Sequence, residues 1–141
     1  MGDSGFLLDT NVISETRQKR PEPRVIAFLA SLRHDLVWLS VLTLGELRKG
    51  AISKLRTDKK KGHELARWVE SVEASYSQRL LSVDAAVASV WAKLEAARPR
   101  PVVDTLIAAT ALVHELTLVT RDVREVHDTG ASIVNPWDPG S

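Results

Sequence analysis

Residues 5–14, GFLLDTNVIS, place a short apolar run directly before an acidic residue and the start of a helix. The apolar run predicts a buried strand that ends at Asp9, and Thr10 and Asn11 are residue types that favour turns and helix caps. A helix is therefore expected to begin near Val12. A buried strand followed at once by a helix is typical of folds that are built on parallel strands.

The same alternation continues along the chain. Further strands are predicted at residues 36–40 (LVWLS), 80–82 (LLS), 116–120 (LTLVT) and 133–134 (IV). Further helices are predicted at 23–32, from 41 to about 55, at 65–76, from a cap at Asp84 to the RPRP run at 98–101, and from 102 to about 112. Short strands alternating with helices predict an α/β fold with a mainly parallel central sheet, in a single domain over 1–141. In such sheets, sites form beyond the carboxyl ends of the strands.

Composition excludes several classes of protein. A chain of 141 residues with 44% hydrophobic and 26% charged residues is long enough and apolar enough to fold around one core. The absence of cysteine excludes disulfides, thiolate metal sites and cysteine nucleophiles. No apolar run is long enough to span a bilayer, and the first twelve residues lack the pattern of a secretory signal. We therefore expect a cytoplasmic protein with no membrane association.

Charge is nearly balanced overall but is unevenly distributed. The net charge is +1, from 19 basic and 18 acidic residues, and this balance alone indicates no partner. Two stretches are locally basic, namely Arg17, Lys19, Arg20 and Arg24, and then Arg48, Lys49, Lys54, Arg56, Lys59, Lys60 and Lys61. Such stretches either bind phosphate backbones or form solvated helical faces, and both interpretations stay open.

Four acids occupy positions where a site is expected. Asp9 follows the first strand directly, and Asp122 follows the strand LTLVT by two residues. Asp104 lies in the first turn of the most apolar helix, and Glu46 lies in the helix after LVWLS. Each acid alone has an ordinary explanation as a helix cap, a dipole partner or a solvated residue. Their shared placement predicts that Asp9, Glu46 and Asp104 converge in one cleft, with Asp122 at its edge.

A cleft lined by carboxylates usually needs a cation, because the charges repel one another and raise each other's pKa values. Oxygen ligands without a nearby cysteine or histidine favour Mg²⁺ or Mn²⁺ over zinc. The four histidines of the chain show no paired metal-ligand spacing. A divalent ion in such a cleft suits hydrolysis of phosphodiester bonds, through one ion or two.

Five segments, in order along the chain, resemble motifs of the PIN-domain toxins. They are residues 6–14 (FLLDTNVIS), 39–50 (LSVLTLGELRKG), 103–109 (VDTLIAA), 118–122 (LVTRD) and 133–137 (IVNPW). The last segment is similar to the ending of the VapC and FitB-like branch. This resemblance implies a PIN-like α/β/α sandwich. It also implies an Mg²⁺-dependent endoribonuclease that acts as the toxin of a type II toxin–antitoxin system.

The resemblance also implies roles for particular residues. It implies that the catalytic acids and metal ligands are Asp9, Glu46, Asp104 and Asp122. Asn11 and Thr120 match polar positions that orient ligands or water through hydrogen bonds. Many relatives carry Asp-Phe where this chain has Glu125 and Val126, so Glu125 is held as an alternative fourth acid to Asp122.

The resemblance implies partners as well: an RNA substrate, a small VapB-like antitoxin, and a homodimer or a toxin–antitoxin hetero-oligomer. Two other functions stay open. A haloacid-dehalogenase-like phosphatase also begins with an aspartate after a strand, but that family carries a second aspartate where this chain has Asn11. A non-catalytic RNA-binding module would keep the fold without cleaving RNA.

Overall fold

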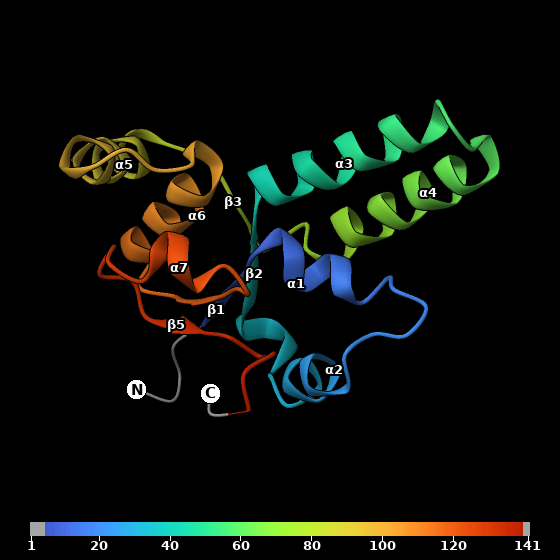
Figure 1. Cartoon of the computed structure of the whole chain (residues 1–141), viewed down its shortest axis with the longest axis horizontal. Helices are drawn as coiled ribbons and strands as arrows, with labels where there is room; N and C mark the ends of the chain where they lie inside the picture. The colour runs from blue at the N-terminus through green and yellow to red at the C-terminus, as the bar shows by residue number, and fades with distance from the viewer. Residues whose placement is uncertain (1–4, 140–141) are drawn as a thin grey trace.

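The computed structural model describes residues 5–139, so both ends of the predicted 1–141 domain lie outside the described residues. Strands and helices alternate along the chain, as Figure 1 shows. The elements are β1 (Phe6–Leu8), α1 (Thr10–Glu15), α2 (Pro23–Ala30), the 3-10 turn η1 (His34–Leu36), β2 (Val37–Ser40), α3 (Val41–Leu55), α4 (Lys59–Ser75), β3 (Leu80–Leu81), α5 (Ala85–Ala97), α6 (Val102–Val113), β4 (Thr117–Val119), α7 (Val123–Val126) and β5 (Ile133–Val134). No helix within residues 5–139 combines the length and apolar content needed to cross a membrane.

The five strands form one sheet in the order β3-β2-β1-β4-β5, and every pair is parallel. The strand β1 is central, with Leu7 opposite Trp38 on one side and Leu8 opposite Val119 on the other. A central parallel strand is buried on both faces, which is why GFLL contains no polar residue. The predicted α/β fold is thus confirmed, and the carboxyl ends of all five strands lie along one edge.

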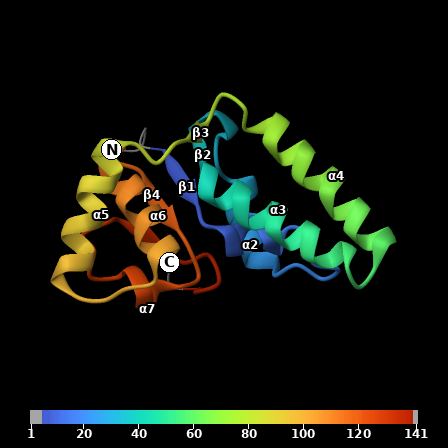
Figure 2. The same cartoon turned by 90° about the horizontal axis from the view of Figure 1, so that it is seen from above.

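Helices cover both faces of the sheet, which gives three layers. Leu7 and Leu8 are adjacent in β1 and therefore point to opposite faces. Leu8 packs in one core with Leu39 and Val69, while Leu7 packs in a second core with Ile107. Figure 2 shows α5 and α6 on one side of the sheet and α3 and α4 on the other. The arrangement matches the α/β/α sandwich expected from the resemblance.

The predicted elements are present, but two helices begin earlier than expected. Helix α1 begins at Thr10 rather than near Val12, because the Asp9 carboxylate accepts a hydrogen bond of 2.8 Å from the Thr10 N–H and caps the helix. Helix α4 was expected at 65–76 and begins instead at Lys59, where the Asp58 side chain caps it. The short helix α7 was not predicted.

Helices α3 and α4 form an antiparallel pair that extends away from the sheet (Figure 1). The pair is close-packed near its tip, where a Cβ on Gly62 would lie 2.7 Å from the backbone nitrogen of Leu55. Glu46 lies near the start of α3, so Leu55 stands about 14 Å further along the axis at 1.5 Å per residue. The basic residues 59–61 therefore lie far from Glu46, at the tip of the pair.

Candidate functional site

Three of the four predicted acids meet at the carboxyl edge of the sheet. Asp9 follows β1, Asp122 lies three residues beyond β4, and Asp104 lies in the first turn of α6. One carboxylate oxygen from each of the three lies within 4.8 Å of the others. Segments that are about a hundred residues apart in sequence are thus joined in one acidic cluster, as the strand-end argument predicted.

The first acid of the cluster is held in place by hydrogen bonds. Asp9 is only 6% exposed, and its carboxylate accepts bonds of 2.7 Å from the Thr120 hydroxyl and 2.8 Å from the Thr10 N–H. The Thr120 oxygen in turn accepts a bond of 3.0 Å from the Asp122 N–H. Thr120 therefore fixes the spacing between the carboxylate of Asp9 and the backbone of Asp122.

The Asn11 amide connects the two loops that carry these acids. Its nitrogen donates to Asp122 at 3.0 Å and lies 3.5 Å from the second oxygen of Asp9. Its oxygen accepts a bond of 3.3 Å from the Arg121 N–H. An amide that donates toward two carboxylates offsets part of their repulsion without adding a charge. Asn11 and Thr120 thus contact the carboxylates that they were expected to orient.

The expected places of Glu46 and Asp122 are exchanged: Asp122 belongs to the converging set, and Glu46 lies beside it. This exposed side chain accepts a hydrogen bond of 2.5 Å from the Thr10 hydroxyl. The same hydroxyl oxygen lies 3.2 Å from that of Thr43, which is fully buried. From the sequence, Thr10 is expected only as a turn or cap residue, and Thr43 is not among the predicted site residues. The sequence could have indicated Thr43, because it lies three residues before Glu46 and a spacing of three places both on one face of α3.

Burial, together with repulsion by neighbouring acids, raises the pKa values of Asp104 and Asp9. The pKa of Asp104 rises to about 6, first through burial and then through repulsion by neighbouring carboxylates, which are those of Asp9, Asp122, Glu46 and Glu125. Burial also raises the pKa of Asp9, although hydrogen bonds from Thr120 and Thr10 act in the opposite direction. Glu125 acts on Asp104 at longer range, and it is not among the three residues whose oxygens converge.

This donor set fits a divalent cation with a preference for oxygen. It consists of carboxylates alone, and the metal-free protein holds them close together at an electrostatic cost. A bound dication would offset that cost. No histidine belongs to this group, and cysteine is absent from the whole chain, so the donor chemistry does not favour zinc.

Arg98 and Arg100, in the linker between α5 and α6, both bind one carboxylate. The Asp128 carboxylate accepts hydrogen bonds from Arg98 at 2.8 and 3.0 Å and from Arg100 at 2.7 Å. These bonds hold the pKa of Asp128 well below its usual range. They tie the linker between α5 and α6 to the end of α7. From the sequence, this linker (RPRP) is expected only to end one helix and start the next.

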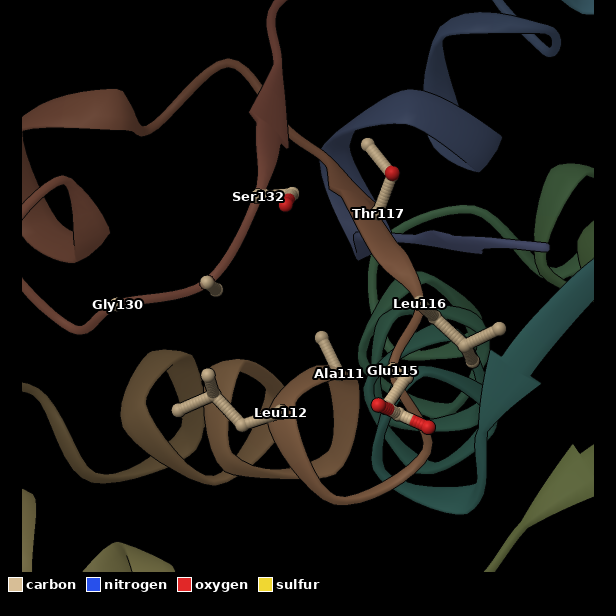
Figure 3. A pocket seen from close by; sticks show the side chains of 8 residues that line it. Ala111, Leu112, Glu115, Leu116, Thr117, Gly130 and Ser132 are labelled. Carbon is tan, nitrogen blue, oxygen red and sulfur yellow. The ribbon is translucent and has the colours of Figure 1, made fainter. Parts of the chain in front are cut away.

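A hollow of about 370 Å³ lies at the opposite edge of the sheet. Figure 3 shows it between the end of α6, at Ala111 and Leu112, and the segment that contains Gly130 and Ser132. Glu115 is the one ionisable residue among those that line it. The hollow opens at the amino end of β4, so it is separate from the acidic cluster.

This chain is similar in sequence and in structure to proteins of one family. The family described as PIN domain matches residues 6–130. Toxin FitB of Neisseria gonorrhoeae is 38% identical over 94% of this chain and 98% of that protein. VapC ribonuclease Y4jK of Sinorhizobium fredii is 32% identical over 95% of this chain and 99% of its own length. The crystal structure of FitAcB from N. gonorrhoeae aligns with a TM-score of 0.87 at 37% identity, over 94% of this chain and 98% of that chain.

Proposed function

This chain belongs to the PIN-domain family, in its VapC-type branch, and we propose that it is an Mg²⁺-dependent endoribonuclease that acts as the toxin of a toxin–antitoxin pair. The observation that carries the proposal is the convergence of Asp9, Asp104 and Asp122 within 4.8 Å. Two relatives that match over nearly their whole length are named as a toxin and as a ribonuclease. The haloacid-dehalogenase alternative has no support, because the matching family is a different one and because Asn11 stands where that alternative requires a second aspartate.

We assign Asp9, Asp104 and Asp122 as the direct ligands of the ion and Glu46 as the acid at the rim of the same site. A small, hard ion suits an all-carboxylate set, so Mg²⁺ is the proposed cofactor and Mn²⁺ should replace it. When bound, such an ion polarises the phosphate and stabilises the negative charge that develops during hydrolysis. Glu125 lies outside the converging set, so Asp122 is the better candidate for the fourth acid.

The protein groups around the ligands have distinct tasks in this proposal. Thr120 and Asn11 hold the Asp9 and Asp122 carboxylates at a fixed spacing before substrate arrives. Hydrolysis joins a water oxygen to phosphorus, breaks the bond to the leaving ribose oxygen, and moves one proton from water to that oxygen. Glu46 is exposed, and its Oε1 accepts a hydrogen bond from Thr10, so we assign Oε2 to take the proton from water and pass it to the leaving oxygen.

The proposed biological setting follows from the activity. A ribonuclease that acts in the cytoplasm of its own cell needs an inhibitor, so we propose a VapB-like antitoxin as the cognate partner. We further propose that the chain is a single domain over 1–141 and that it forms a homodimer within the toxin–antitoxin complex. RNA is the proposed substrate.

The test compares wild-type protein with Asp9→Asn, using Asp35→Asn as a matched control. Asp35 is exposed and precedes β2, at the opposite edge of the sheet from the cluster. Wild type and Asp35→Asn should cut total cellular RNA with Mg²⁺ or Mn²⁺ and stop in EDTA, while Asp9→Asn should fold but not cut. Equal cleavage by Asp9→Asn would contradict the assignment. RNA binding by wild type without any cleavage would instead support the non-catalytic module.

A further inference from the structure

Arg121 lies between a residue that contacts the acidic cluster and one that belongs to it. Its neighbours are Thr120, whose hydroxyl donates to Asp9, and Asp122, whose carboxylate belongs to the converging set. Its backbone N–H is fixed by the Asn11 amide at 3.3 Å. The residue itself is exposed. Hydrogen bonds to the N–H groups of Arg121 and Asp122 therefore fix the backbone that carries this arginine.

The guanidinium of Arg121 rests on an aromatic platform. Its central carbon lies 5.0 Å from the centroid of the Trp137 ring. Trp137 packs against the core, and its turn is closed by a bond of 3.0 Å from its N–H to the Asn135 side chain. That turn follows β5, which pairs with β4, and β4 ends two residues before Arg121. Arg121 follows β4 and Trp137 follows β5, so the two side chains start from the same edge of the sheet.

The residue next to Asp122 in the chain thus carries a guanidinium that contacts an aromatic ring. Within residues 5–139, Arg121 forms no salt bridge with Asp9, Asp104 or Asp122. Arg98 and Arg100, by contrast, are both paired with Asp128. Stacking on a ring uses the face of a guanidinium and leaves the N–H groups at its edge able to donate.

We propose that Arg121, positioned by Trp137, binds a phosphate of the RNA strand next to the acidic cluster. The inference rests on the proposed function, because it concerns how that site takes its substrate. A planar guanidinium donates two parallel hydrogen bonds to a phosphate, which fixes orientation as well as supplying charge. Arg121 is thus a substrate-binding residue, and Trp137 is a positioning residue that acts through it.

The experiment measures the affinity for a short fluorescent single-stranded RNA of mixed sequence. It is done in EDTA, so that the strand is not cut, and across a salt series. Arg121→Ala should weaken binding about tenfold, since it removes a charge-assisted hydrogen-bond pair. It should also reduce the slope of log affinity against log salt by about 0.7, the value for one lost phosphate contact on a single strand. Arg121→Lys keeps the charge, so it should keep the slope and lose only about threefold in affinity.

Two variants of Trp137 test the role of its ring, and a third variant, at Arg33, serves as the control. Trp137→Phe keeps an aromatic ring and should bind RNA nearly as wild type does, whereas Trp137→Leu should lose affinity in the direction of Arg121→Ala. Thermal unfolding of each variant separates a loss of RNA contact from a loss of folding. Arg33→Ala removes an arginine with a 69% exposed side chain that precedes β2, at the opposite edge of the sheet, and should leave affinity unchanged.

The possible outcomes separate this inference from the proposed function. If wild type cuts RNA with Mg²⁺ and Arg121→Ala binds with unchanged affinity and slope, the inference is overturned and the enzyme assignment stands. An equal loss in Arg33→Ala would also overturn it, because the effect would then be one of general charge. If Arg121→Ala loses affinity while wild type fails to cut, the phosphate contact is supported and the proposed function fails. Wild type that binds no RNA would overturn both.

Discussion

Replacement of Asp104 by asparagine should stabilise the metal-free protein near neutral pH. The carboxylate of Asp104 is one of three whose oxygens lie within 4.8 Å of one another. Burial, then repulsion by Asp9 and the other acids, raises its pKa from 3.8 to about 6. The folded state therefore holds this group as an anion at a cost that the unfolded chain does not have. Asparagine has nearly the same shape and carries no charge.

The size of the effect follows from the shift in pKa. A rise of about two pH units corresponds to about 3 kcal/mol at 1.36 kcal/mol per unit. Solvent at this partly exposed side chain screens some of the repulsion, so we expect a gain of about 2 kcal/mol in the free energy of unfolding. For a chain of this length that gain raises the midpoint of thermal unfolding by roughly 6 °C.

The sign of the pH dependence is fixed by the direction of the shift. Between about pH 4 and pH 6 the folded wild type binds more protons than the unfolded chain, so its stability falls as pH rises through that window. Above about pH 6 the penalty is complete, and below about pH 4 it is absent, because Asp104 is then protonated in both states. The advantage of Asp104→Asn should therefore be full near neutral pH and should vanish in acid.

The assay is urea unfolding in EDTA near neutral pH and again at about pH 4, the unperturbed range of an aspartate. Asp35→Asn is the control and should match wild type at both. Added Mg²⁺ should raise the unfolding midpoint of wild type but not that of Asp104→Asn, because a ligand stabilises only the state that binds it. If Asp104→Asn were no more stable than wild type near neutral pH, or kept the same advantage in acid, the account of mutual repulsion would be refuted.

Three further predictions concern other parts of the chain. Glu115 has a positive φ of 54° after α6, so Glu115→Gly should raise the free energy of unfolding by about 1 kcal/mol in urea, and a loss of stability would contradict this. A Cβ on Gly62 would meet the Leu55 backbone at 2.7 Å, whereas Gly50 has open space around it. Gly62→Ala should thus lower the free energy of unfolding by about 1 to 3 kcal/mol, and Gly50→Ala should raise it by about 0.5 to 1 kcal/mol. Equal shifts of the two variants in thermal unfolding would argue against close packing of α3 on α4. Thr120→Val should fold but cut RNA about 10- to 100-fold more slowly, while Thr120→Ser keeps the hydroxyl and the rate; equal rates for the two would rule out the hydrogen-bond role.

The parts of the fold that could be predicted from sequence are those that a single local pattern determines. The run GFLL is apolar at every position because β1 is covered on both faces. Asp104 stands out because it is the lone acid in a helix that is otherwise almost wholly apolar. The meeting of these acids followed from the parallel sheet, since parallel strands end at a common edge.

The remaining features depend on geometry that no local pattern contains. The start of α4 was missed because three lysines at its first turn resemble a solvated loop, and only the Asp58 cap marks the helix there. The bond between Thr10 and Glu46 joins residues 36 positions apart and depends on how α1 meets α3. The Arg121–Trp137 contact likewise depends on the register of β4 against β5.

The central claim is that Asp9, Asp104 and Asp122 hold the divalent ion on which RNA cleavage depends. Diffraction from crystals of RNA-cleaving protein soaked in Mn²⁺, recorded so that manganese gives an anomalous signal, tests it most directly. We expect an anomalous peak among these three carboxylates in wild type and its loss in Asp104→Asn, which should also fail to cut RNA. A peak elsewhere in the molecule, or an unchanged peak in the inactive variant, would contradict it.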